Sequence, residues 1–205
     1  MSAPACPRCA HSVGPFGVQD AGCMFCRDKN RQINASVRAG RYTGTTATLL
    51  RAFKYHGRDE LDDVFGRILF DALQLADWTG TVDALVIVPT HWRHSLRRAY
   101  YAPALLARNL SRRTKIPIAP ILRRVTGGPH QFNVPHSERA ANIRGKFSTI
   151  PGVHIDGATL CLIDDVSTTG ATLDECARVL RRTGAAAVFA AVATRVDADR
   201  ITDDV

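Results

Sequence analysis

The stretch that decides the fold is Leu160-Cys161-Leu162-Ile163-Asp164-Asp165-Val166-Ser167-Thr168-Thr169-Gly170-Ala171-Thr172. In it, an apolar run and two carboxylates are followed by hydroxyl side chains and a glycine. Short continuous apolar runs are typical of buried parallel strands, so we predict a strand over 159–163. A helix is predicted from Ala171 to about Thr183, because Gly184 is a natural C-terminal cap. The stretch therefore predicts a strand, a loop and a helix in direct succession.

The loop has the composition of a phosphate-binding turn. Backbone N–H groups at a helix N-terminus are unpaired and carry partial positive charge, which favours an anion. Gly170 permits close backbone approach and a positive φ, and the acids before the turn suit the hydroxyls of a sugar as acceptors. The alternative interpretation is helix capping by Ser or Thr, which needs no ligand but explains only one of the hydroxyls. The hydroxyl donors are Ser167, Thr168, Thr169 and Thr172.

The rest of the chain alternates between helical and strand patterns. This alternation predicts an α/β fold in which a mostly parallel sheet is flanked by helices. The segment 118–122 is too short to assign, and 126–135 is predicted to be a loop because of its Gly and Pro content. Helices are predicted over 48–55, 60–76 and about 99–111, and further strands over 83–89 and 187–193.

Four cysteines near the N-terminus form two Cys-x₂-Cys pairs that are separated by 13 residues. Each pair can place two thiolates on one metal, and two pairs complete a closed tetrahedral Cys₄ site with a structural role. Disulfides and an iron–sulfur cluster are the alternatives. We predict a small zinc-ribbon lobe over 1–35, which has almost no core without a metal, and a second domain over 36–205. The predicted ligands are Cys6, Cys9, Cys23 and Cys26.

The 205-residue chain has a net charge of +8 and a hydrophobic fraction of 45%, with a pI near 9.6. This charge favours polyanionic partners, either nucleic acid or phosphorylated small molecules, although a solvated basic surface is the alternative. No apolar run approaches the roughly 18 residues of a membrane-spanning helix. The N-terminus also lacks the features of a signal peptide, so we expect a cytoplasmic protein without membrane insertion.

The stretch from Leu160 to Thr172 resembles the signature of type I phosphoribosyltransferases. The resemblance implies a core five-stranded parallel sheet with a flexible loop and a hood, and phosphoribosyl pyrophosphate as the ligand. It implies that Asp164 and Asp165 contact the ribose hydroxyls and steady a cationic sugar. It also implies that Mg²⁺ is held chiefly by oxygens of the ligand. The residues that it places around the 5-phosphate are Val166, Ser167, Thr168, Thr169, Gly170, Ala171 and Thr172.

A Cys₄ ribbon that precedes such a domain resembles the ComF family, which is named for bacterial competence. Where that family tends to have Arg-Gly-Phe-Asn-Gln, this chain has Arg98-Ala99-Tyr100-Tyr101-Ala102, which lacks the amide side chains. The segments that carry the resemblance are Phe53-Lys54-Tyr55-His56-Gly57-Arg58, Val88-Pro89 with Arg98, and Gln131, Arg139 and Asn142 before Gly145-Lys146-Phe147.

Basic residues elsewhere complete the predicted site. Ligands of open α/β sheets lie beyond the carboxyl ends of the strands, and the loop after Val88-Pro89 follows such an end. We predict that Arg93, Arg97 and Arg98 bind pyrophosphate by charge-assisted hydrogen bonds, with a plain basic surface loop as the alternative. Candidates for the substrate and hood region are Lys54, Arg139 and Asn142.

The sequence leaves two functions open for this protein. The first is an enzyme that transfers the phosphoribosyl group of phosphoribosyl pyrophosphate–Mg²⁺ to an unidentified base or amine. The second is a non-catalytic DNA-uptake factor that binds single-stranded DNA or a partner ATPase of the competence machinery.

Overall fold

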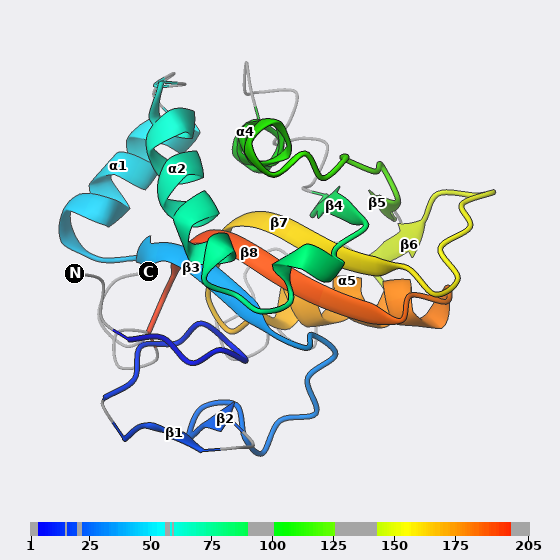
Figure 1. Ribbon diagram of the computed structural model, residues 1–205, viewed down its shortest axis with the longest axis horizontal. Helices are drawn as coiled ribbons and strands as arrows, with labels where there is room; N and C mark the ends of the chain where they lie inside the picture. Colours follow the sequence, from blue (N-terminus) through cyan, green and yellow to red (C-terminus); the bar gives the residue numbers. More distant parts are fainter. Residues whose placement is uncertain are drawn as a thin grey trace.

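The computed structural model describes residues 4–14, 16–19, 22–55, 58, 60–89, 101–125 and 143–197. At its centre lies a parallel four-stranded sheet in the order β3-β8-β7-β4 (Figure 1). The two central strands are the apolar runs of the sequence, and eight of the nine residues of β8 are buried. The strands are β3 (Ser36–Arg41), β4 (Ala84–Ile87), β7 (Thr159–Ser167) and β8 (Ala187–Arg195).

The outer side of β4 carries a single parallel bridge instead of a fifth strand. Leu85 pairs with Ile118, through the bonds Leu85 N–H to Pro117 O at 2.8 Å and Ala119 N–H to Leu85 O at 2.9 Å. Pro117 and Pro120 lack the N–H groups that a longer ladder would need. In the described residues the central sheet therefore consists of four strands and this bridge, where the family resemblance implies five strands.

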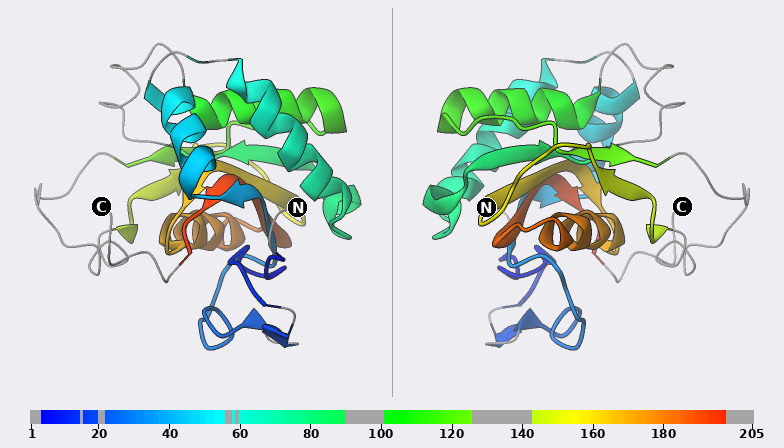
Figure 2. Two further views of the ribbon diagram at one scale, coloured as in Figure 1. Left: turned by 90° about the vertical axis from the view of Figure 1, so that its left-hand side faces the viewer. Right: turned by 90° about the vertical axis from the view of Figure 1, so that its right-hand side faces the viewer.

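Helices cover both faces of the sheet. Helices α1 (Gly44–Tyr55), α2 (Leu61–Gln74) and α4 (Ala102–Thr114) pack on one face, and α5 (Ala171–Arg182) packs on the other (Figure 2). Side chains of β7 alternate between the two resulting cores, as expected for a strand that is buried on both faces. Leu160 and Leu162 face α5, whereas Cys161 and Ile163 face the three-helix side. The α/β prediction, with a parallel sheet flanked by helices, is confirmed.

The N-terminal lobe lies on the same face of the sheet as α5 (Figure 2). It contains the short antiparallel strands β1 (Val18–Gln19) and β2 (Gly22–Cys23). Its four cysteines form a small buried cluster of their own, apart from both cores of the sheet. The predicted clustering of cysteines at the N-terminus is confirmed.

Several elements differ from the sequence-based expectation. Strand β3 was not predicted, because its residues Ser-Val-Arg-Ala-Gly-Arg show neither an apolar run nor clean alternation. The antiparallel pair β5 (Leu122–Arg124) and β6 (Phe147–Thr149) was also missed, since each strand has only three residues. Strand β7 continues to Ser167, past the predicted end at 163, because it remains paired with β8 through both acids.

The remaining predicted elements are observed with shifted ends. Helix α1 begins at Gly44 instead of 48, and α4 covers Ala102–Thr114 instead of about 99–111. A short 3₁₀ helix, η1 (Thr79–Thr81), follows α2. Shifts of this size are usual at helix ends, which fray and carry irregular turns. In the part of the chain that the structure describes, no helix is both long and apolar enough to cross a membrane.

Helices α2 and α4 approach closely at Gly66. A Cβ atom at this position would lie 2.4 Å from Cγ and 3.0 Å from Cβ of Asn109. The Asn109 side chain is held in place, since its Oδ1 accepts a 2.7 Å hydrogen bond from Arg113 Nε and the residue is 2% exposed. The contact leaves no room for a side chain at position 66 of α2.

We expect Gly66→Ala to lower the free energy of unfolding by about 1–2 kcal/mol. The overpacking at Asn109 outweighs the roughly 1 kcal/mol that alanine gains from its higher helix propensity. Urea denaturation followed by circular dichroism measures the change. Gly80→Ala is the matched control, because a Cβ at Gly80 meets nothing within 4 Å. Equal stability of the two variants would contradict the close-contact argument.

Candidate functional site

The turn between β7 and α5 has the geometry that the sequence predicts. Gly170 adopts φ +83° directly before the first residue of α5, a conformation that glycine adopts without a Cβ penalty. Ala171 N–H donates to Thr169 Oγ1 at 3.3 Å. This bond closes a local turn between Thr169 and Ala171, while the N-cap residue Gly170 makes no side-chain capping bond, so capping does not explain the hydroxyls of the turn.

The backbone of the turn presents unpaired donors. Among the described residues, the amide N–H groups of Thr168, Thr169 and Gly170 have no protein acceptor. The turn's carbonyls, in contrast, are engaged: Ser167 O accepts from Val196 N–H at 2.9 Å, and Thr169 O accepts from Arg31 Nη2 at 3.0 Å. Unpaired amides at the positive end of a helix can bind an anionic group such as a phosphate.

Lys54 reaches the acid pair from the last turn of α1. Its Nζ lies 2.9 Å from Asp165 Oδ2, and the two side chains are only 17% and 12% exposed. The sequence suggested Lys54 for the substrate region without a partner, and the structure brings it to the end of β7. The contact places a cation beside the Asp165 carboxylate at this edge of the sheet.

Asp164 differs in ionisation from an ordinary aspartate. Burial, reinforced by the neighbouring charge of Asp165, raises its pKa from 3.8 to about 8, against the opposing effects of the Asp165 N–H and Lys54. The raised pKa brings the ionisation of Asp164 close to the neutral range. Since the pKa is raised on folding, this group opposes folding increasingly as the pH rises from about 4 through 8.

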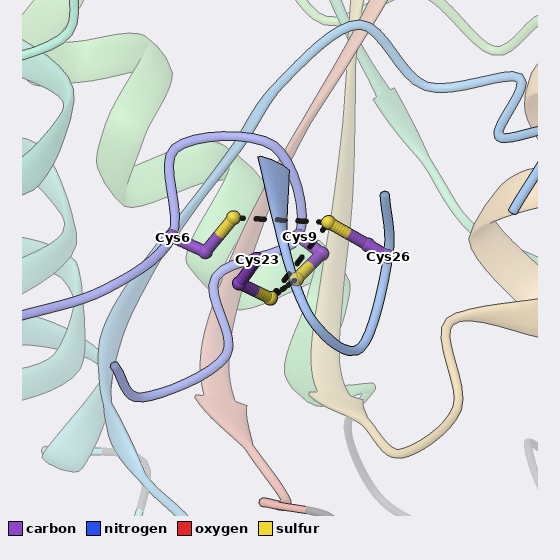
Figure 3. A group of neighbouring side chains, drawn as sticks. All are labelled: Cys6, Cys9, Cys23 and Cys26. Carbon is purple, nitrogen blue, oxygen red and sulfur yellow. Dashed lines mark hydrogen bonds between the residues drawn. The ribbon is translucent and has the colours of Figure 1, made fainter. Parts of the chain in front are cut away.

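The four N-terminal cysteines converge on one point (Figure 3). Their ligand atoms all lie within 4.8 Å of one another, with sulfur–sulfur distances of 3.8 Å for Cys6–Cys26, 3.6 Å for Cys9–Cys23 and 3.8 Å for Cys23–Cys26. A tetrahedron with metal–sulfur bonds of about 2.3 Å has edges of about 3.8 Å. The four cysteines are unbridged and buried, so the cluster fits a thiolate-bound metal and not a pair of disulfides.

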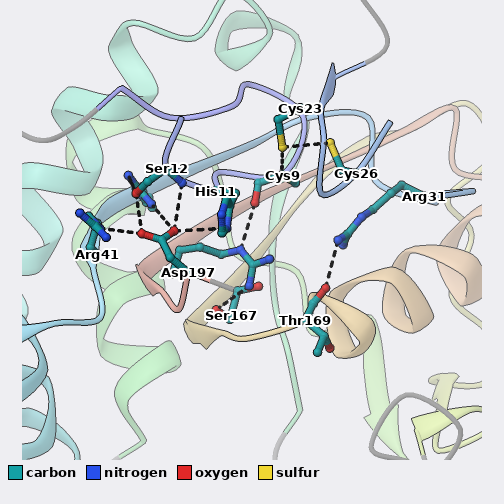
Figure 4. Close-up of polar contacts among 12 residues, drawn as sticks. Cys9, His11, Ser12, Cys23, Cys26, Arg31, Arg41, Ser167, Thr169 and Asp197 are labelled. Carbon is teal, nitrogen blue, oxygen red and sulfur yellow. Dashed lines mark hydrogen bonds and ion pairs between the residues drawn. The ribbon is translucent and has the colours of Figure 1, made fainter. Parts of the chain in front are cut away.

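A buried carboxylate joins the lobe to the sheet (Figure 4). Asp197 accepts hydrogen bonds from Ser12 N–H at 3.0 Å, Ser12 Oγ at 2.6 Å and Arg41 Nε at 2.6 Å, and lies 3.3 Å from His11 Nδ1. Burial alone would raise the pKa of Asp197, but the Ser12 hydrogen bonds and the charges of His11 and Arg38 lower it. The sequence analysis missed this cluster, because its members are far apart in the chain and share no motif.

The other predicted residues divide into two groups. The structure places Asp164, Asp165 and the residues from Val166 to Thr172 at one edge of the sheet with Lys54. The remaining candidates lie outside the described residues, so their assignment stays a prediction. They are Arg93, Arg97, Arg98, Arg139 and Asn142.

Known proteins give an independent comparison. No protein-family model matches the chain. Competence protein F of Haemophilus influenzae is 28% identical over 183 residues, which cover 87% of this chain and 80% of that protein. The DNA utilization protein YhgH of Escherichia coli is 29% identical over 189 residues, which cover 89% of this chain and 80% of that protein. The chain is homologous to these competence and DNA utilization proteins. The resemblance to the ComF family is thereby confirmed.

Solved structures that align with the chain are only distantly similar to it. The allosteric regulatory enzyme of purine biosynthesis aligns with a TM-score of 0.45 and 18% identity, over 83% of this chain and 32% of that chain. A hypoxanthine phosphoribosyltransferase from Staphylococcus aureus aligns with a TM-score of 0.41 and 16% identity, over 72% of this chain and 69% of that chain.

The cysteine cluster predicts one bound zinc per chain. We expect Cys23→Ser to lose most of the metal and to lower the melting temperature, because a closed site with three thiolates holds zinc poorly. Elemental analysis of the purified proteins measures the metal content. Cys161→Ala is the control: this cysteine is also buried, but it lies in the sheet core, so the variant should lose stability and keep its zinc. Iron in place of zinc, or full metal content in Cys23→Ser, would contradict the assignment.

Proposed function

We propose that this ComF homologue binds phosphoribosyl pyrophosphate with Mg²⁺ and transfers its phosphoribosyl group to a base or an amine. The observation that carries the proposal is the edge at the end of β7, where two carboxylates precede a turn with three unpaired amides. Donors for a phosphate and acceptors for sugar hydroxyls thus lie one after the other along the chain. This order matches a ribose that carries a phosphate on its 5-carbon.

In the proposed complex, the turn from Val166 to Thr172 surrounds the 5-phosphate. The side chains of Asp164 and Asp165 accept hydrogen bonds from the ribose hydroxyls. A hydroxyl that donates to Asp165 competes with Lys54 for this carboxylate, and the displaced ammonium stays close to the anionic ligand. Arg93, Arg97 and Arg98 are proposed for the pyrophosphate, and Arg139 and Asn142 for the acceptor region.

The reaction breaks the bond between C1 of the ribose and the pyrophosphate oxygen, which leaves with the bonding electrons. The lone pair of the acceptor nitrogen then forms the new bond to C1, and the nitrogen releases a proton to the solvent. Positive charge develops on the sugar between these events, and the Asp165 carboxylate stabilises it electrostatically. Mg²⁺, if held by oxygens of the ligand, would offset the charge of the leaving pyrophosphate. The remaining contribution of the protein is to hold the reactants in place.

The cysteine cluster is proposed to hold a structural zinc ion. Four thiolates fill the coordination sphere of tetrahedral zinc and leave no position for a reacting group. The metal site also lies on the α5 face, behind the turn and away from Lys54. The proposed transfer reaction therefore does not run through this metal.

Isothermal titration with phosphoribosyl pyrophosphate and Mg²⁺ tests the binding. We expect saturable binding by the natural chain and about tenfold or more weaker binding by Asp165→Asn, which loses a charged acceptor. Asp71→Asn is the control, because Asp71 is an exposed acid on α2. Absence of binding at millimolar ligand would refute the proposal. Pyrophosphate release in the presence of a panel of bases and amines then tests the transfer step.

The same titration has a predicted pH dependence. The pKa of Asp164 is raised to about 8, so binding through its carboxylate at pH 7 must release a proton. Affinity should therefore rise between pH 6.5 and 8.5, and the binding enthalpy at pH 7 should depend on the ionisation enthalpy of the buffer. Asp164→Asn should abolish both effects. Buffer-independent enthalpy in the natural chain would show that Asp164 does not bind as a carboxylate.

A second candidate function is binding of single-stranded DNA or of a partner ATPase in DNA uptake. It is favoured by the relatives named for competence and DNA utilization and by the net charge of +8. We expect a fluorescent single-stranded oligonucleotide to bind with an affinity that falls at least tenfold between 50 and 200 mM salt, because counterions are released. A duplex of the same sequence is the control. Unchanged anisotropy at 50 mM salt would exclude the DNA-binding function.

A further inference from the structure

The N-terminal lobe, which carries the four cysteines, packs directly against the turn between β7 and α5, on the side where the turn's carbonyl oxygens lie. A cavity of only about 10 Å³ remains between them, lined by Cys9, Arg31, Ser167, Gly170 and Arg195 among others. Such a volume holds at most about one water molecule. Two arginines cross this junction, and each of them ends on a carbonyl oxygen of the turn. Figure 4 shows the first of them, Arg31, beside Thr169.

Arg31 follows the second cysteine pair in sequence and forms the first connection. Its Nη2 donates to Thr169 O at 3.0 Å and its Nη1 donates to Asp174 Oδ2 at 2.9 Å, with the side chain 6% exposed. Gln32 N–H donates to the other oxygen of Asp174 at 3.2 Å. The guanidinium lies so close to Gly170 that a Cβ there would be 2.2 Å from Arg31 Nη1. Gly170 is thus required for this contact as well as for its positive φ.

Arg195, at the end of β8, forms the second connection. Its Nε donates to the carbonyl oxygen of Cys9 at 3.2 Å, and its Nη1 donates to Ser167 O at 3.0 Å. Arg195 is 5% exposed. One guanidinium therefore joins the backbone of a predicted metal ligand to the first residue of the phosphate-binding turn.

These two contacts fix the direction of the turn's amides. In a trans peptide unit the C=O of one residue and the N–H of the next point in opposite directions. Because the carbonyls of Ser167 and Thr169 point to the lobe, the N–H groups of Thr168 and Gly170 point away from it. These are amides without a protein acceptor among the described residues. The carbonyl side of the turn is thus held by Arg31 of the lobe and by Arg195 and Val196 at the end of β8, and the amide side is left open.

We propose that Arg31 and Arg195 are positioning residues through which the folded metal lobe holds the turn between β7 and α5 ready for a phosphate. The inference deepens the proposed function and rests on it. It gives the lobe a role in ligand binding although the lobe does not touch the ligand. Loss of the metal loosens the lobe, so the Thr169 carbonyl loses its contact with Arg31 and Arg195 loses its anchor on the Cys9 carbonyl, and the amides no longer converge on one anion.

Ribose 5-phosphate is the probe for this proposal, because it carries the 5-phosphate without the pyrophosphate. We expect Arg31→Met to weaken its binding about tenfold, as measured by isothermal titration. Arg181→Met is the matched control. Arg181 Nε donates to Gln32 O at 2.8 Å and so ties the same connecting segment to the opposite end of α5. Both variants should lose thermal stability, but only Arg31→Met should lose affinity. Equal affinity of Arg31→Met and the natural chain would overturn the proposal, as would equal weakening by both variants.

Chemical rescue separates positioning from general stability. Removal of the side chain in Arg31→Ala leaves space for a small cation beside Thr169 and Asp174. We expect millimolar ethylguanidinium to restore most of the affinity for ribose 5-phosphate in this variant, and to have no effect on Arg181→Ala. Failure of rescue in a folded, zinc-loaded Arg31→Ala protein would count against the proposal.

Backbone amide resonances keep this test independent of the proposed function. In ¹⁵N-labelled protein without ligand, the Thr168 and Gly170 resonances should shift in Arg31→Met and after removal of the metal by a chelator, and stay in place in Arg181→Met. If the natural chain binds neither ribose 5-phosphate nor phosphoribosyl pyrophosphate while these shifts occur, the proposed function fails and the positioning role stands. If the ligands bind and the resonances do not move, the positioning role fails alone.

Discussion

Backbone amides can bind an anion only if the protein does not use them itself, and the turn between β7 and α5 depends on this constraint. A flexible turn would satisfy its own N–H groups through local hydrogen bonds or collapse onto the helix. Here the carbonyl oxygens of Ser167 and Thr169 accept hydrogen bonds from Arg195 and Arg31. Gly170 has no Cβ, which would otherwise obstruct the contact of Arg31. The lobe lies on the α5 face of the sheet. From there it supplies a partner to the carbonyl side of the turn and leaves the amide side open.

The junction has an energetic cost, because guanidinium groups are removed from water. Burial lowers the pKa of Arg38 and Arg195 below the usual range, which is the sign of an unfavourable environment for a cation. Asp197 offsets part of this cost by its ion pairs with Arg38 and Arg41. A buried pair of this kind adds little net stability, but breaking it leaves an uncompensated charge. The cluster therefore makes separation of the lobe from the sheet unfavourable, because separation would break these pairs.

The sequence predicts the parts of this protein that depend on local patterns. Three features are encoded by short local patterns: the strand before Asp164, the helix after Gly170 and the Cys-x₂-Cys pairs. The sequence therefore predicts their positions to within a few residues. Strand β3 is different, because it is stabilised by β8 and by the Arg38–Asp197 pair across 159 residues of sequence. The roles of Arg31 and Arg195 likewise depend on the packing of the lobe against α5. Contacts of this kind have no periodicity and no motif, and only the folded chain shows them.

Asp164 and Asp165 follow each other at the end of β7 but differ in environment. Asp165 is paired with Lys54, whereas burial and the charge of Asp165 raise the pKa of Asp164 to about 8. The Lys54 ammonium offsets the charge of Asp165, which would otherwise repel a ligand that carries several phosphate groups. The different environments of the two acids thus suit a site that must accept a sugar's hydroxyls and tolerate its phosphates at the same time.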